Sequence, residues 1–217
     1  MKVCILFLAF GLFLTNGVLA GEEISDDKKH EISLNATTFI KDFLTFNNST
    51  VSLLNPYLLN YKYYFGKSAI RTGIGFDFSS SKTSDINDFE LKSRIHSIDY
   101  RIGMEWKNRL ANRWMLFYGF DVIYNRNKST VITDNGFDVT TDLEMSNGIG
   151  TGPVLGIMFL ISERIRIYAE SSIYYIHADT KDETLFESFP EFDIKNTGSS
   201  DDLNLNLPTS VFFAITF

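Results

Sequence analysis

The sequence predicts an all-β fold, an eight-stranded antiparallel up-and-down transmembrane β-barrel, from three observations. Apolar and polar residues alternate with period 2 through eight segments, which is typical of strands with two unlike faces. The connections between these segments are alternately short and long, as in spanning barrels with tight turns at one end and loops at the other. Aromatic residues make up 15% of the chain, and many lie near the expected strand ends, where they favour membrane–water interfaces.

The N-terminal residues 1–20 predict a signal peptide, and residues 21–217 predict a single barrel domain. A charged residue precedes a nearly all-apolar run at 3–14, and residues 18–20 are small or tolerated before a cut. The apolar run is too short for a transmembrane helix. The only cysteine, Cys4, lies inside this peptide, so the mature domain would form no disulfide.

Alternation is clearest in the middle of the chain. Between residues 94 and 106, Ile98, Tyr100 and Ile102 alternate with Asp99 and Arg101. Since strand side chains point alternately to two faces, we expect the bulky apolar set to meet lipid and the polar set to face the interior. The eight expected strands are 31–46, 57–65, 69–78, 94–106, 114–124, 149–160, 164–177 and 203–217.

The connections separate into two classes by length. The short ones would be periplasmic turns and the long ones extracellular loops, with both termini on the short-turn side. The short connections are 66–68, 107–113 and 162–163. The long ones are 47–56, 79–93, 125–148 and 178–202.

The last expected strand places Val211, Phe213, Ile215 and Phe217 on one face. This pattern resembles the C-terminal strand of bacterial outer-membrane β-barrel proteins, which ends in Phe after alternating apolar residues. The resemblance implies that these four residues form an assembly signal for the barrel-insertion machinery.

The mature chain as a whole resembles the small eight-stranded outer-membrane proteins of the OmpA transmembrane-domain and OmpX type. Its segments Pro56–Leu59 and Tyr61–Lys67 are similar to outer-membrane barrels of the Bacteroidetes. The resemblance implies a location in the bacterial outer membrane, with membrane lipid and lipopolysaccharide as partners, and it carries over no functional residues. A secreted lipocalin-like barrel is the alternative fold. Gly, Arg, Asp and Glu on the polar faces, opposite bulky apolar faces, favour the membrane barrel.

Placing the polar faces inside predicts a charge network in the lumen. Positive and negative side chains are nearly balanced there, and buried charges must pair. A barrel of eight strands is just wide enough for side chains to fill, so the network favours a plug over a pore. Arg166 and Glu170 lie four residues apart on one face, too far to touch each other in a strand, so we expect both to reach across the lumen to the third to fifth strands. The expected network contains Lys62, Arg71, Asp77, Asp99, Arg101, Glu105, Asp121, Arg166 and Glu170.

These patterns favour a non-enzymatic barrel with a structural or surface-interaction role through its long loops. A narrow channel for small or apolar molecules is one alternative. An enzyme at the rim is another, with His96 or His177 as the candidate base beside a nucleophile and a carboxylate. The net charge of −7 argues against nucleic-acid binding, and no cofactor is expected. The acidic connection 178–202 could bridge divalent cations, which prefer oxygen ligands.

Overall fold

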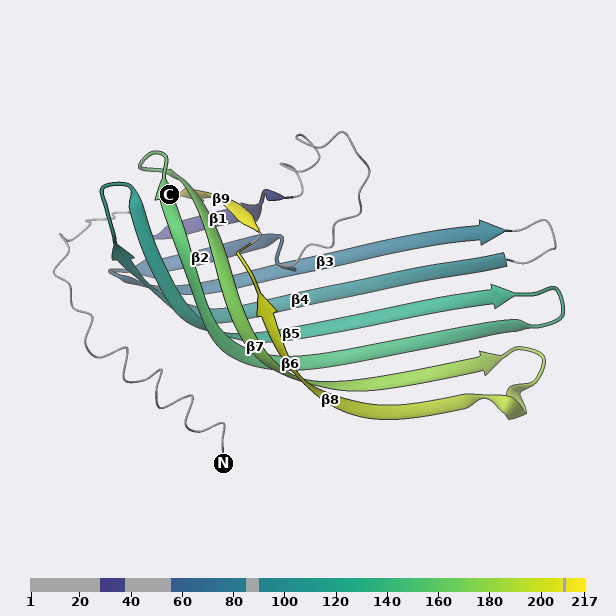
Figure 1. The fold of residues 1–217 in the computed structure, drawn as a ribbon. Coiled ribbons are helices and arrows are strands. Elements are labelled where there is room, and N and C mark those ends of the chain that lie inside the picture. The colour runs from purple at the N-terminus through teal and green to yellow at the C-terminus, as the bar shows by residue number, and fades with distance from the viewer. Residues whose placement is uncertain (1–27, 38–55, 85–89, 209) are drawn as a thin grey trace, which may run out of the picture.

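The computed structural model describes residues 28–37, 56–84, 90–208 and 210–217, which form one antiparallel sheet closed into a ring (Figure 1). A short 3-10 helix, η1 (Pro190–Phe192), lies at the tip between β7 and β8. The strands are β1 (His30–Asn35), β2 (Leu59–Phe65), β3 (Ser68–Ser84), β4 (Glu90–Arg109), β5 (Trp114–Asp134), β6 (Val139–Leu160), β7 (Ile165–Phe186), β8 (Ile194–Asn206) and β9 (Val211–Thr216).

Eight strand positions close the ring, and β8 and β9 share the eighth. Neighbours in the chain pair from β1 to β7, β9 pairs with the first half of β7 and with β1, and β8 pairs with the second half of β7. The chain leaves the sheet between Asn206 and Val211, where Pro208 has no N–H to donate to a ladder. The closed antiparallel ring confirms the predicted all-β, up-and-down barrel.

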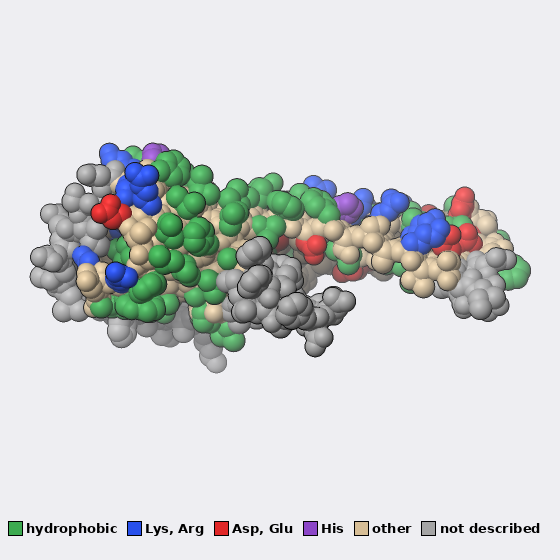
Figure 2. Space-filling view, turned by 90° about the horizontal axis from the view of Figure 1, so that it is seen from above, with side chains coloured by type: hydrophobic (Ala, Val, Ile, Leu, Met, Phe, Trp, Pro, Cys, Tyr) green, Lys and Arg blue, Asp and Glu red, His purple; other side chains and the backbone are tan. Residues whose placement is uncertain are grey.

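Burial alternates along the ring strands, with polar residues inside and apolar residues outside. In β2, Asn60, Lys62 and Tyr64 are buried, whereas the residues between them are exposed. We call the exposed apolar side chains on the outside of the ring the apolar belt; Figure 2 shows hydrophobic side chains gathered over this end of the molecule. The belt includes Ile32, Leu34, Leu59, Tyr61, Phe65, Ile70, Tyr100, Ile102, Met104, Trp114, Val122, Tyr124, Ile149, Leu155, Ile157, Ile173, Tyr175, Leu203, Leu205, Phe213, Ile215 and Phe217.

The strands β3 to β8 continue well past the ring and form an open sheet on one side (Figure 1). The prediction that 79–93, 125–148 and 178–202 are loops is therefore wrong, because most of these residues are paired strand. We call this part the distal sheet. It comprises residues 76–84, 90–98, 126–134, 139–147, 177–186 and 194–201.

The distal strands were predicted as loops because they are largely polar on both faces. In β5, Asn127, Ser129 and Thr133 face the same way as the lumen residues, and Arg126 and Lys128 face the other way. A strand signal that depends on one apolar face is absent there. Backbone pairing with neighbouring strands holds these residues instead.

Two predicted strands need correction at their ends. The segment 31–46 yields only β1, which ends at Asn35, and residues 38–46 lie outside the described residues. The segment 203–217 is interrupted, and β8 begins earlier, at Ile194. The predicted signal peptide and most of the connection 47–56 also lie outside the described residues. None of the helices in the described residues is long and apolar enough to cross a membrane.

The ring is filled by side chains. In its centre, Tyr168 stacks on Phe212 with ring centroids 4.8 Å apart, and Phe117 meets Tyr168 edge to face with centroids 5.6 Å apart. Inward glycines make room for long side chains. A Cβ at Gly73 would lie 2.7 Å from Nε of Arg101, and a Cβ at Gly156 would lie 2.1 Å from Cζ of Phe117.

Candidate functional site: the buried charge network

The lumen holds a network of four basic and four acidic side chains, all of them at least 96% buried. Because strands alternate their faces, each of these residues lies at an inward position of its strand. The network draws on six strands, β1 to β5 and β7. Its members are Lys62, Arg71, Arg101, Arg166, Glu31, Glu105, Asp121 and Glu170.

Glu31 is the centre of the part nearer the short turns. Its Oε2 accepts hydrogen bonds from Nη1 of Arg166 at 3.2 Å and from the Tyr64 hydroxyl at 2.9 Å. Its Oε1 lies 3.6 Å from Nζ of Lys62. Lys62 also contacts Glu105, with Nζ 2.9 Å from Oε2, so it links this part to the rest of the network.

Glu170 is the centre of the other part. Arg71 donates from Nη2 to its Oε2 at 2.7 Å, and Arg101 donates from Nη1 to its Oε1 at 2.5 Å. Nη1 of Arg71 also donates to Glu105 at 3.3 Å, which joins the two parts. Asp121 lies 3.4 Å from Nε of Arg71 and accepts a hydrogen bond from a tyrosine.

Aromatic rings form walls around the cations. Nζ of Lys62 lies 4.3 Å from the ring centroid of Tyr168 and 4.6 Å from that of Phe117. The guanidinium carbon of Arg101 lies 4.2 Å from the ring centroid of Tyr57. Cations over aromatic faces are stabilised electrostatically, and more strongly where water is excluded. The aromatic walls therefore add to the carboxylate contacts that hold Lys62 and Arg101 in place.

Seven of the nine residues proposed from the sequence come together here, and two lie elsewhere. Asp77 is exposed on the distal sheet, because β3 at this point lies beyond the level at which the ring closes. Asp99 lies half-buried at the mouth of the ring and accepts a hydrogen bond from Oγ of Ser97 at 3.2 Å.

The expected reach across the lumen is confirmed for Glu170, which spans from β7 to Arg71 in β3 and Arg101 in β4. Arg166 contacts Glu31 in β1, two positions away around the ring, which the sequence did not predict. The predicted network did not include Glu31. Ile32 and Leu34 point outward, and because neighbouring residues of a strand alternate, Glu31 beside Ile32 must point inward.

The network can close a barrel but offers little for catalysis. Every charge in it is satisfied by an opposite charge, and buried ions of this kind are held because breaking one pair leaves another uncompensated. Paired ions and packed rings in a ring of eight strands fill the interior, as is typical of barrels of this size.

The candidate catalytic histidines lie outside the lumen, on the outer face. The ring of His96 packs edge-on against Phe78, with centroids 5.4 Å apart. Nδ1 of His177 is 2.9 Å from Oδ1 of Asp201, and its Nε2 is 3.9 Å from Asp179. Among the described residues, the ring of His177 has carboxylate partners and no serine within hydrogen-bond distance.

His177 and Asp201 shift each other's proton affinity. The hydrogen bond with Asp201 is the main cause that raises the pKa of His177 above its ordinary value of 6.5. The same contact, with a second hydrogen bond from the Tyr175 hydroxyl, lowers the pKa of Asp201. Both side chains are exposed at the start of the distal sheet, so the pair is a surface contact.

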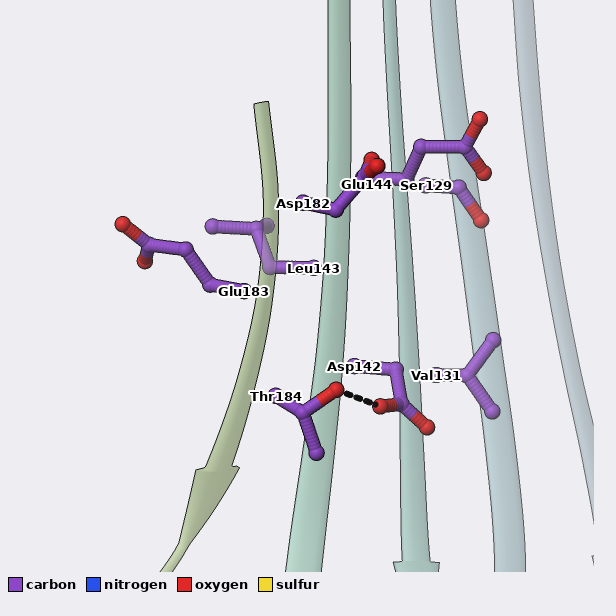
Figure 3. A pocket seen from close by; sticks show the side chains of 8 residues that line it. All are labelled: Ser129, Val131, Asp142, Leu143, Glu144, Asp182, Glu183 and Thr184. Atoms are coloured by element: carbon purple, nitrogen blue, oxygen red, sulfur yellow. Dashed lines mark hydrogen bonds between the residues drawn. The ribbon is translucent and has the colours of Figure 1, made fainter. Parts of the chain in front are cut away.

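A shallow hollow of about 300 Å³ lies on the distal sheet, across β5, β6 and β7 (Figure 3). Asp142 accepts a hydrogen bond from the Thr184 hydroxyl at 2.7 Å, and Glu144 stands directly opposite Asp182. In the part of the chain that the structure describes, no group of three or more His, Cys, Asp or Glu residues is arranged to hold a metal ion. The carboxylates that line the hollow make it polar and acidic.

The residues expected to form the assembly signal close the ring. Phe213, Ile215 and Phe217 point outward and are exposed, and Val211 lies beside them on the same face. The backbones of Phe217 and His30 exchange two hydrogen bonds, of 2.9 Å and 3.1 Å, and their rings stack. This seam between β9 and β1 completes the circle.

Comparisons with known proteins give no relative: no family model, no curated protein and no solved structure matches this chain.

Proposed function

We propose that this protein is a non-enzymatic barrel of the bacterial outer membrane with a plugged lumen, which acts through the distal sheet outside the cell. The observation that carries the proposal is the reversed polarity of the ring. Its interior holds eight paired charges, whereas its exterior is the apolar belt. An outer face of this kind is stable in lipid and costly in water, since exposed apolar patches of such size are rare in soluble monomers.

The direction of the strands supports the same arrangement. The start of β1 and the end of β9 lie at the same end of the ring as the short turns. The distal sheet lies at the opposite end. In outer-membrane barrels, short turns face the periplasm and long extensions face outward. The distal sheet would then stand above the membrane, beyond the lipid headgroups.

The filled lumen favours a plug over a channel. Arg71, Arg101 and Glu170 meet across the ring, and aromatic residues pack beside them. Purified protein in a planar bilayer is expected to give no steady single-channel conductance. Regular current steps would instead support the narrow channel.

The tip of the distal sheet supports a surface-interaction role. Phe137 is 95% exposed in the turn after β5, and Phe189 and Phe192 are exposed at the neighbouring tip. Side-chain hydrogen bonds hold these turns: Asn135 accepts from the N–H of Phe137 at 3.0 Å, and Asp138 accepts from the N–H of Ser188 at 2.9 Å. Exposed aromatics on rigid turns are typical of binding hot spots, because little order is lost on binding.

Protease treatment of intact cells tests the location and orientation together. Added trypsin should cleave at Lys and Arg of the distal sheet and leave a protected fragment that contains the ring. Cells with a permeabilised outer membrane should also be cleaved at the short turns, for example after Lys67. Recovery of the protein in the soluble periplasmic fraction would contradict the proposal.

A further inference from the structure

All Lys and Arg residues in the described part of the distal sheet lie on its outer face, which continues the face of the apolar belt. This follows from strand alternation, since residues of the same parity in the ring are exposed. The inner face carries carboxylates instead, including Asp142, Glu144 and Asp182. The basic residues of the outer face are Lys82, Lys92, Arg94, Arg126, Lys128, Lys181 and Lys195.

Three of these residues form a group directly beyond the apolar belt, which we call the rim cluster: Arg94 in β4, with Arg126 and Lys128 in β5. Tyr124, 41% exposed, is the last belt residue of β5, and Arg126 follows it at the next outward position. All three basic side chains are exposed. Figure 2 shows basic side chains beside the edge of the hydrophobic region.

The three charges are crowded. Arg126 and Lys128 are two residues apart on one face, which corresponds to roughly 6.6 Å along a strand. Lys128 pairs with His96 across the strands, so Arg94 is its diagonal neighbour at about 7–8 Å. At the levels of Arg126, Lys128 and Thr130, the outward positions of β3 to β6 carry no Asp or Glu among the described residues. Like charges in this arrangement repel, and an anion between them would relieve the repulsion.

Three other basic residues of the outer face are different, because each lies within ion-pair distance of a carboxylate. Nζ of Lys82 and Nζ of Lys92 lie 2.9 Å and 2.5 Å from Oε1 of Glu90. Lys181 pairs with Glu183 in the same way, at 2.5 Å. The rim cluster is therefore set apart both by its position at the belt and by the lack of internal carboxylate partners.

We propose that the rim cluster binds the phosphate groups of an anionic lipid in the outer leaflet. This inference rests on the proposed function, because it needs the apolar belt to be immersed in lipid. Arg and Lys bind phosphate by charge-assisted hydrogen bonds, and basic residues next to a membrane-spanning segment attract anionic headgroups. Phe76 and Phe78 of β3 are 52% and 61% exposed and lie level with Arg126 and Lys128, so acyl chains have an apolar surface beside the phosphate site. An amphiphile fits both features, whereas free phosphate fits only one.

Purified protein in an uncharged detergent can be titrated with lipid A that carries its phosphates, with dephosphorylated lipid A, and with inorganic phosphate. Native mass spectrometry then gives the bound fraction. We expect phosphorylated lipid A to bind most tightly. The variant Arg126→Gln/Lys128→Gln should bind it about 30-fold more weakly, which is the loss expected for two basic residues at a charged membrane surface. The matched control is Lys82→Gln/Lys181→Gln, which changes the net charge equally and should bind as the unmodified protein does.

Three outcomes would overturn the inference. They are equal binding of the two forms of lipid A, an equal loss in both variants, and inorganic phosphate competing as well as the lipid does. None of them touches the proposed function, since a barrel can sit in the membrane without binding headgroup phosphate. A soluble protein that never partitions into detergent would refute both.

Discussion

Arg101 is held in the lumen by contacts of three kinds. It pairs with Glu170 at 2.5 Å, donates from Nε to Asn60 at 3.1 Å, and packs on the ring of Tyr57. The change Arg101→Ala removes one partner and leaves the carboxylates of the network with less positive charge. We expect the free energy of unfolding to fall by about 3–5 kcal/mol, the usual loss for one half of a buried ion pair. Urea unfolding in detergent, followed by the gel shift on heating, measures it.

The exposed Lys82→Ala is the control for Arg101→Ala. Lys82 pairs with Glu90 on the surface, and such pairs contribute about 0–1 kcal/mol. Equal unfolding midpoints for the two variants would mean that Arg101 is solvated and that the lumen is open.

His177 provides a prediction about pH at the surface. Because Asp201 raises the pKa of His177, their contact is fully present below pH 6.5 and is lost as the pH rises through the pKa in the folded protein. Because the pKa of Asp201 is lowered, the contact is also lost in acid, below the ordinary value of 3.8. An NMR titration should place the His177 midpoint above 6.5, and Asp201→Asn should lower it towards that value, because the main cause of the raised pKa is removed. The neighbouring Asp202→Asn should leave it unchanged, and a midpoint indifferent to Asp201→Asn would contradict the contact.

At the scale of residues, the sequence predicted most of the charges now found in the lumen. Lys62, Arg71 and Asp121 lie in strands with an apolar opposite face, so alternation alone assigns them inward. Glu31 was missed because β1 has only six residues and a different register could be drawn through the segment that follows it. Asp77 was misplaced because alternation gives the face of a residue but not the level at which a ring closes.

Among the elements, β9 closes the ring by pairing with β1 on one side and β7 on the other. Phe217, which directly follows β9, exchanges two backbone hydrogen bonds with His30 and stacks on the His30 ring, with centroids 5.5 Å apart. Deleting Phe217 should lower the yield of the folded, heat-modifiable form, because the seam loses these bonds and the expected assembly signal loses its end. A conservative Phe217→Tyr keeps both and should fold normally. Normal folding of the deletion variant would show that the seam closes without its last residue.

The hairpins of the distal sheet should be dispensable for folding. Every member of the apolar core cluster, from Met115 and Phe117 to Phe212, lies in the ring part, and none lies in the distal sheet. A variant whose three distal hairpins are cut back to the level of Asn125 and joined by Asn-Gly turns should still give the heat-modifiable form. Failure of this variant to fold would show that the distal sheet helps to align the ring strands.

For the molecule as a whole, the sequence predicted the ring but not its extension. The number of strands, their order and the inward and outward faces follow from alternation and from the short turns. The distal sheet depends on pairing between polar strands such as those around Asn127 and Thr180, where neither face is apolar. Pairing of this kind is cooperative across neighbouring strands, and no single segment reveals it.

The unbroken run of β4 to β7 from ring to tip has a mechanical consequence. β6 alone has 22 residues, which corresponds to roughly 73 Å of strand. A force applied at the tip and directed along the strands would load the hydrogen bonds between neighbours in shear, many at once, because these bonds lie across the strands. A sideways force would instead peel the outer strands β3 and β8 one bond at a time. The molecule should therefore resist tension along its strands far better than a sideways force applied at the tip.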